Sequence, residues 1–176
     1  MLQLSLLVET LVASWRAAPA ARRAALEQRR FPVHDGGCLA FRVPREWREE
    51  IALASSVSSV VFRPAARRRN LLRISMQPLS ARESASFSIE GMRTEVERAA
   101  SSAPGEPQME PLAGRFGGGF HFCAVQVANG RRIFRTQGMF LVKPVLLQFR
   151  IETSRAENGL RRAALELICS ARPSSG

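Results

Sequence analysis

The chain of 176 residues has the length of a single domain, and a hydrophobic content of 45% is enough for one sizeable core. A charged fraction of 23%, with ordinary glycine and proline counts, excludes a wholly disordered, collagen-like or disulfide-dense chain. The net charge of +11 is typical of proteins that bind nucleic acid or anionic membranes. Lys143 is the only lysine, however, so a genome rich in GC codons also explains the arginine excess.

The first 15 residues predict either a targeting segment or a surface helix. Glu9 interrupts their apolar run, no basic residue precedes the run, and the uninterrupted stretch is too short to span a bilayer. Ala18-Pro19-Ala20 has the small-x-small form of an export cleavage site. One helical face carries the apolar side chains, which are Leu4, Leu7, Val8, Leu11 and Trp15. Two hypotheses stay open: a degenerate export signal, or an amphipathic helix that contacts the domain, a partner or a membrane surface through residues 1–16.

Residues 17–30 are rich in arginine and predict a solvated helix or linker. Strand signals begin at Phe31. We therefore expect an N-terminal segment over residues 1–30, a single domain over residues 31–172 and a short tail over residues 173–176. These residues leave the location of the protein open: it is cytoplasmic if residues 1–20 are not a signal.

The first half of the domain predicts two strand pairs. Residues 31–34 and 38–43 flank the turn Asp35-Gly36-Gly37. Pro44 ends this pair, and Trp47 is placed to close one end of the core. Residues 57–63 and 71–77 form a second hairpin, and its tip carries the basic residues Arg67, Arg68 and Arg69.

The second half predicts a helix, three strands and a final helix. Apolar residues recur at helical spacing over residues 86–101, and a proline-rich loop follows. Extended runs cover residues 112–127, 131–142 and 145–153. Asn129-Gly130 joins the first two runs as a type I′ hairpin turn, and Lys143-Pro144 joins the last two. The final helix covers residues 154–171, where Ser154 and Glu157 form a capping box.

This order of elements predicts an α+β fold with helices packed on a twisted, mainly antiparallel sheet. Several segments also resemble the PsbP-like superfamily, which includes photosystem extrinsic subunits, a Ran-binding regulator and many bacterial proteins, often exported. The segments that carry the resemblance are Val43-Pro44-Arg45-Glu46-Trp47, Leu71-Leu72-Arg73-Ile74-Ser75, Phe134-Arg135-Thr136-Gln137-Gly138, Leu146-Leu147-Gln148-Phe149 and Ala163-Ala164-Leu165-Glu166. The resemblance covers residues 31–172 and implies an α/β/α sandwich and a periplasmic or exported location. None of these segments is a catalytic signature.

The sequence offers little catalytic chemistry. His34 and His121 are the only histidines, Asp35 is the only aspartate, and no Gly-x-Ser-x-Gly elbow is present. We therefore expect no enzyme and no cofactor. His121 and Cys123 share a strand face and are candidate zinc or copper ligands, joined by Cys38 or His34; the alternative is that they only line a packed sheet. We expect no metal.

Two further features of the sequence are candidates for anion binding: a glycine-rich segment and clusters of arginine. Residues 115–120 are glycine-rich but lack the sequel of a phosphate loop, so they predict a flexible start of a strand or a bulge. Arg67, Arg68, Arg69, Arg131 and Arg132 are candidate contacts for an acidic partner or for nucleic acid. The strand phenylalanines are expected in the core, however, and no DNA- or RNA-binding motif accompanies the charge.

The sequence therefore favours a non-enzymatic protein-interaction domain of a bacterium. Its expected partner is another protein, and an acidic one would complement the charge. Two alternatives stay open. The domain is an adaptor or chaperone for a secreted protein, with an apolar groove for partner helices, or it binds nucleic acid or another polyanion through its arginines. If the two main basic clusters share a face, an acidic partner is favoured; if they do not, the charge reflects codon usage.

Overall fold

The structure is a computed structural model that describes residues 25–33, 37–53, 57–65, 70–154 and 158–174. Within these residues a seven-stranded antiparallel sheet has the order β3-β4-β5-β9-β8-β7-β6, and a small sheet has the order β1-β2-β10. The strands are β1 Leu26–Val33, β2 Gly37–Pro44, β3 Trp47–Leu53, β4 Ser58–Pro64, β5 Leu71–Pro78, β6 Met109–Ala113, β7 Gly118–Ala128, β8 Arg131–Val142, β9 Val145–Thr153 and β10 Arg172–Pro173. The helices are α2 Ala81–Ser86, α3 Ile89–Ser101 and α4 Asn158–Cys169. The predicted α+β class with a mainly antiparallel sheet is confirmed.

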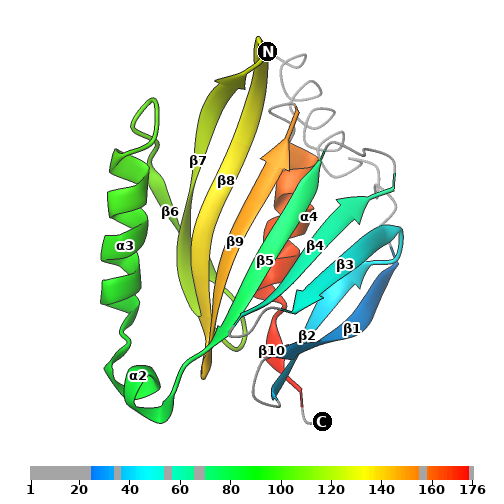
Figure 1. Ribbon diagram of the computed structural model, residues 1–176, viewed down its shortest axis with the longest axis vertical. Coiled ribbons are helices and arrows are strands. Elements are labelled where there is room, and N and C mark those ends of the chain that lie inside the picture. Colours follow the sequence, from blue (N-terminus) through cyan, green and yellow to red (C-terminus); the bar gives the residue numbers. More distant parts are fainter. Residues whose placement is uncertain (1–24, 34–36, 54–56, 66–69, 155–157, 175–176) are drawn as a thin grey trace, which may run out of the picture.

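The main core lies between one face of the large sheet and a layer made by α4 and the small sheet. Its fully buried side chains include Phe41 of β2, Phe62 of β4 and Leu167 of α4. On the other face, α3 packs Val96 and Ala100 against β7. Figure 1 shows α4 partly hidden behind the sheet, and α3 at its β6 end, away from β3, β4 and β5. One face of the large sheet is thus covered broadly, and the other mainly near its β6 end.

The hairpins follow the turn signals. Asn129 and Gly130 have φ values of 51° and 71°, which a type I′ turn requires, and β7 and β8 pair from Ala128 and Arg131 onward. Strand β8 pairs with β9 across Lys143-Pro144, β4 pairs with β5, and β1 pairs with β2. Each predicted strand pair is therefore confirmed.

Residues 26–30 correct the prediction for the N-terminal segment. They belong to β1, whose backbone pairs with β2 from Leu26 opposite Pro44 to Val33 opposite Gly37. A helix or linker up to Arg30 is therefore wrong for these residues. The rest of the N-terminal segment, residues 1–24, lies outside the described residues, and so does His34.

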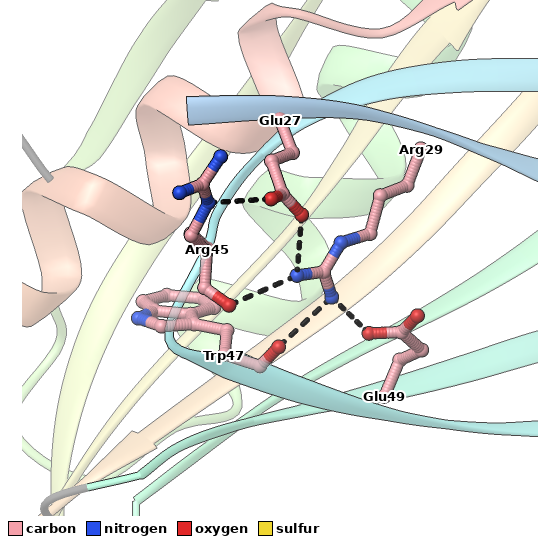
Figure 2. Close-up of polar contacts among 5 residues, drawn as sticks. All are labelled: Glu27, Arg29, Arg45, Trp47 and Glu49. Atoms are coloured by element: carbon pink, nitrogen blue, oxygen red, sulfur yellow. Dashed lines mark hydrogen bonds and ion pairs between the residues drawn. The ribbon is translucent and has the colours of Figure 1, made fainter. Parts of the chain in front are cut away.

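Arg29 joins the small sheet to the large one. Its guanidinium donates to the carbonyl oxygens of Trp47 at 2.8 Å and of Arg45 at 3.1 Å, and it pairs with the carboxylates of Glu27 and Glu49 (Figure 2). A second arginine, Arg45, donates to Glu27 at 2.6 Å, and this hydrogen bond is the largest cause that lowers the pKa of the Glu27 carboxyl. The Arg29 side chain therefore fixes the β2–β3 turn, whereas the sequence predicted only a solvated basic face.

Trp47 closes one end of the core, as predicted. It is buried, and its ring lies 6.5 Å from the ring of Phe62. The strand β3 that begins at Trp47 was not predicted.

The glycine-rich segment is a close contact between strands rather than a bulge. The predicted run 112–127 is divided into β6 and β7, and the pairing of β7 with β8 continues without a gap from Gly118 opposite Leu141. A Cβ atom on Gly119 would lie 1.9 Å from the carbonyl oxygen of Met139, and one on Gly138 would lie 2.3 Å from that of Phe120. These positions exclude any side chain, so the prediction of a bulge is wrong, whereas a strand does begin at Gly118.

The helix predicted over residues 86–101 begins later than expected, at Ile89. Ser88 caps α3 by accepting a hydrogen bond from the amide of Gly91 at 3.0 Å. A short helix that was not predicted, α2, begins after a capping box formed by Ser80 and Glu83. In α4 the described residues begin at Asn158, so the predicted capping residue Glu157 lies outside them.

Candidate functional site

The face of the large sheet that carries α3 remains polar and uncovered by any described helix over β3, β4, β5 and β9. Side chains alternate between the faces of a strand, and the buried residues of β4 and β5, such as Phe62 and Ile74, point to the opposite side. We call the uncovered part the open face. Its residues are Arg48, Glu50, Ser59, Val61, Arg63, Arg73, Ser75, Arg135, Gln137, Gln148, Arg150 and Glu152. Arginine dominates its charge, because only two glutamates accompany five arginines in this set.

A groove of about 260 Å³ lies where the open face meets α3. Its residues come from α3 and four strands, and they are Arg73, Ser75, Glu95, Val96, Ala99, Phe122, Gln137, Gly138, Met139, Gln148, Phe149 and Arg150. One side of the groove is polar, with Arg73 and Arg150 on neighbouring strands. The other side is apolar, because Val96, Met139 and Phe122 belong to the α3 contact. The groove therefore combines charged and apolar surface in one concavity.

Arg73 and Arg150 stand directly opposite each other in the β5–β9 pair. Like charges in this position destabilise a sheet. Arg150 is compensated, since its Nε donates to Glu152 Oε1 at 2.8 Å, and Arg135 Nη2 reaches the same oxygen at 3.0 Å. Arg73 is exposed and makes no hydrogen bond or ion pair among the described residues. The pair therefore carries a positive charge that the described part of the fold leaves without a counter-charge.

The Glu152 carboxylate is held by these two arginines. Burial alone raises its pKa, but the hydrogen bonds from Arg150 and Arg135 outweigh burial and hold the pKa below the ordinary value of 4.5. Glu152 is therefore ionised at neutral pH and is fully engaged with its own neighbours. It leaves Arg73 unneutralised.

Hydrogen-bonding capacity is also unused on the floor of the groove. Ser75, Gln137 and Gln148 have no side-chain hydrogen bond to other described residues. On the rim, Glu95 is already bound to Arg98 Nη1, at 3.1 Å and 3.0 Å for its two oxygens. The free donors and acceptors thus face the groove, and its one acidic residue is paired.

The structure buries His121 beside Arg161 and Glu110. His121 Nε2 lies 3.3 Å from Arg161 Nη2 and 3.5 Å from Glu110 Oε2. Burial lowers the pKa of His121, Glu110 opposes that shift, and Arg161 adds to it. The ring is therefore neutral at neutral pH and its Nε2 accepts from Arg161. Its buried Nδ1 has no hydrogen-bond partner among the described residues.

The candidate metal ligands do not form a complete ligand set in the described part of the chain. Cys123 lies on the same face of β7 as His121, two residues away, and is half-buried. No group of three histidine, cysteine, aspartate or glutamate side chains that would hold a metal occurs among the described residues. A guanidinium next to Nε2 also disfavours a cation at that atom. The expectation that no metal binds stays a prediction.

The candidate basic residues divide between two faces or lie outside the description. Arg67, Arg68 and Arg69 lie outside the described residues, so whether the two clusters share a face stays open. Arg131 and Arg132 are exposed at the start of β8. Strand alternation places Arg131 on the same side as Arg135 of the open face, and Arg132 on the other side.

Sequence reasoning missed the groove residues, although a signal was present. Arg73 and Ser75 on one strand, and Gln148 and Arg150 on another, are the polar halves of two alternating patterns. Such a pattern indicates a sheet face without a covering helix. Only the strand order shows that these two polar halves are neighbours.

Comparisons with known proteins support the fold alone. No family model matches the chain, and no curated protein matches it. A crystal structure from Bacteroides thetaiotaomicron VPI-5482 has a TM-score of 0.53 and 13% identity, covering 78% of this chain and 45% of that chain. LpqN of Mycobacterium tuberculosis, involved in cell envelope biogenesis, has a TM-score of 0.39 and 12% identity, covering 85% of this chain and 92% of that chain. This chain thus spans less than half of the first protein, and the second likeness is too low to support any inference.

None of the helices in the described ranges is both long enough and apolar enough to cross a bilayer.

Proposed function

We propose that this protein is a non-enzymatic interaction domain that holds an acidic partner protein on its open face. The observation that carries the proposal is the Arg73–Arg150 pair, because a fold gains nothing from opposing like charges unless something else neutralises them. Interaction sites favour such arrangements, since charge complementarity steers a partner to the surface and fixes its register. The PsbP-like α/β/α sandwich belongs to the same proposal, with α3 and α4 as its outer layers.

The non-enzymatic part rests on the surroundings of His121. It is the only histidine among the described residues, and its ring contacts an arginine and a glutamate rather than a serine or cysteine nucleophile. General-base catalysis requires a base within hydrogen-bond reach of a reacting group. A buried ring next to a guanidinium lacks that access.

The two alternatives fit the described residues less well. Nucleic-acid binding gains from exposed aromatic rings, but Phe122, Phe140 and Phe149 are buried in strands. An adaptor that cradles apolar helices needs a mainly apolar groove, whereas this groove has Arg73 and Arg150 on one side. An acidic protein surface that also offers an apolar contact fits both the polar side and the apolar side of the groove.

Site-specific photocrosslinking tests the proposal. A photoreactive phenylalanine analogue replaces Ser59 on the open face in one variant, and Gln28 on the outer face of the small sheet in the control. In the native host, we expect one crosslinked protein from the Ser59 position and none from the Gln28 position, and the identified protein must bind the purified domain more weakly as salt rises. Crosslinks from Gln28 alone, or equal crosslinking at both positions, would refute the open face as the interaction surface.

A further inference from the structure

The groove beside α3 selects the chemistry of what it binds, and this inference rests on the function proposed above. Its polar side offers Arg73, whose guanidinium carries five N–H donors in a fixed planar arrangement. None of these donors is used by a described residue. A carboxylate accepts such donors in pairs and gains a charge-assisted hydrogen bond from each.

The neighbouring charges favour an anion at this point. Arg150 lies directly across the strand pair from Arg73 and supplies a second positive charge. Glu95 of the groove and Glu152 of β9 are both engaged, since Glu95 binds Arg98 and Glu152 binds Arg150 and Arg135. An incoming carboxylate therefore relieves the repulsion between Arg73 and Arg150 without displacing an existing ion pair.

The opposite side of the groove adds an apolar contact. Val96 of α3 and Met139 of β8 line it, and Ala99 leaves open space at the exposed rim of the helix because its side chain is small. A volume of about 260 Å³ is below the roughly 300–1,000 Å³ of pockets that enclose a drug-sized ligand. The groove thus has room for one anchoring side chain rather than for a whole lipid or cofactor.

The remaining polar groups suit a peptide backbone. Ser75, Gln137 and Gln148 each offer both a donor and an acceptor, and the described residues leave these side chains unpaired. A peptide group carries one N–H and one C=O, so it matches side chains of this kind.

We infer that the groove binds an acidic peptide segment of the partner, with a carboxylate between Arg73 and Arg150 and an adjoining apolar side chain against Val96 and Met139. The acidic residue and its apolar neighbour together form the recognised unit. Specificity follows from having both groups in one peptide, because an acidic residue alone leaves the apolar side of the groove without a partner, and an apolar residue alone leaves the two arginines without one.

Two synthetic peptides test the inference on the full chain. One is acetyl-Gly-Glu-Phe-Glu-Gly-amide, and its neutral counterpart has glutamine in place of both glutamates. In titrations followed by amide NMR shifts, we expect the acidic peptide to shift the signals of Ser75, Gln137 and Gln148 and to bind about tenfold more tightly than the neutral one. Equal affinity of the two peptides, or shifts confined to other surfaces, would overturn the inference.

Three variants locate the site. Arg73→Gln removes the unpaired guanidinium and is expected to weaken the acidic peptide about tenfold. Ala99→Trp fills the rim of the groove and is expected to abolish the NMR shifts. Arg42→Gln is the matched control, because Arg42 is also exposed and lies at a different concavity, between the small sheet and the end of α4. Unchanged peptide affinity in Arg73→Gln, or an equal loss in Arg42→Gln, would also overturn the inference.

The two levels of the proposal fail differently. If photocrosslinks from Ser59 identify a partner whose affinity for the domain does not change in Arg73→Gln, the open face is the interaction surface but the groove does not bind an acidic segment of that partner. If Ser59 gives no partner while the peptide binds in the groove, the groove is a ligand site and the proposed interaction function is wrong.

Discussion

Removing the Arg29 guanidinium provides a sharp test of how the two sheets are joined. In Arg29→Met the apolar stem of the side chain is kept, but the donors to the carbonyl oxygens of Trp47 and Arg45 are lost, together with the pairing to Glu49. The Arg29 side chain is only 19% exposed, so water replaces these contacts incompletely. We therefore expect Arg29→Met to destabilise the fold.

The magnitude follows from the two carbonyl contacts and from Glu49. Each hydrogen bond from this partly exposed cationic donor to a carbonyl contributes about 1.5 kcal/mol, the low end of the range for charged groups, and a partly exposed ion pair adds less than about 1 kcal/mol. The expected loss in the free energy of unfolding is therefore about 3–4 kcal/mol. Fluorescence-monitored urea unfolding measures this loss, because the buried ring of Trp47 becomes exposed to water.

Arg45→Met is the matched control for that measurement. Its side chain is 71% exposed, and its only side-chain contact among the described residues is with Glu27. We expect a loss below about 1 kcal/mol, as for an exposed ion pair. If Arg29→Met is no more destabilising than Arg45→Met, then Arg29 does not fix the β2–β3 turn and the reasoning fails.

Three further predictions follow from the close contacts and from His121. Gly138→Ala should lower the free energy of unfolding by at least about 2 kcal/mol in urea, since its Cβ meets the Phe120 carbonyl oxygen, whereas Gly118→Ala, whose nearest atom would lie 3.5 Å away, should cost little. The pKa of His121 is lowered in the fold, so the unfolded chain binds a proton that the folded chain does not, and the free energy of unfolding should fall as pH drops below about 6.5. His121→Gln should remove this fall in stability between pH 7 and pH 5.5. The same pH dependence in the variant would refute the prediction. Elemental analysis of untagged protein should find no stoichiometric zinc or copper, and a bound equivalent lost on Cys123 substitution would contradict this.

The elements that the sequence predicted are those with local signals. Asn129-Gly130 requires positive φ at both residues, and only a tight hairpin provides that geometry at this length. The helical repeat of Met92, Val96 and Ala100 matches the buried side of α3. Each of these two signals lies within a few residues of chain, so the turn and the helix can be predicted without knowing which distant segments pack against them.

The strand segments that were missed are poor in apolar residues. The missed first half of β1 is polar over residues 27–30, and its inward-facing Arg29 is satisfied by ion pairs and carbonyl contacts rather than by burial in the core. Strand β3 lies at the edge of the large sheet and carries Arg48, Glu49 and Glu50 in succession. Alternating apolar residues predict strands that pack one face into a core, and neither of these two segments has that alternating pattern.

The groove was not predictable for a different reason. Arg73 and Arg150 belong to strands that are far apart in the chain, and they become neighbours because β5 pairs with β9 rather than with β6. That choice depends on the packing of the whole sheet. The polarity of each strand was visible in the sequence, but the opposing charges were a product of register.

Register also changes how the arginine excess is interpreted. GC-rich codon usage is one explanation for the fact that nearly every basic residue of the chain is arginine, but it does not determine where arginine is retained. Where Arg135 meets Glu152 across β8 and β9, the charge contributes to the fold. Where Arg73 meets Arg150, the charge opposes the fold, and a neutral residue in place of Arg73 would be more stable in the isolated domain. The replacement Arg73→Gln therefore separates the two explanations: codon usage predicts gained stability with no loss of binding, whereas an acidic partner predicts gained stability together with weaker binding.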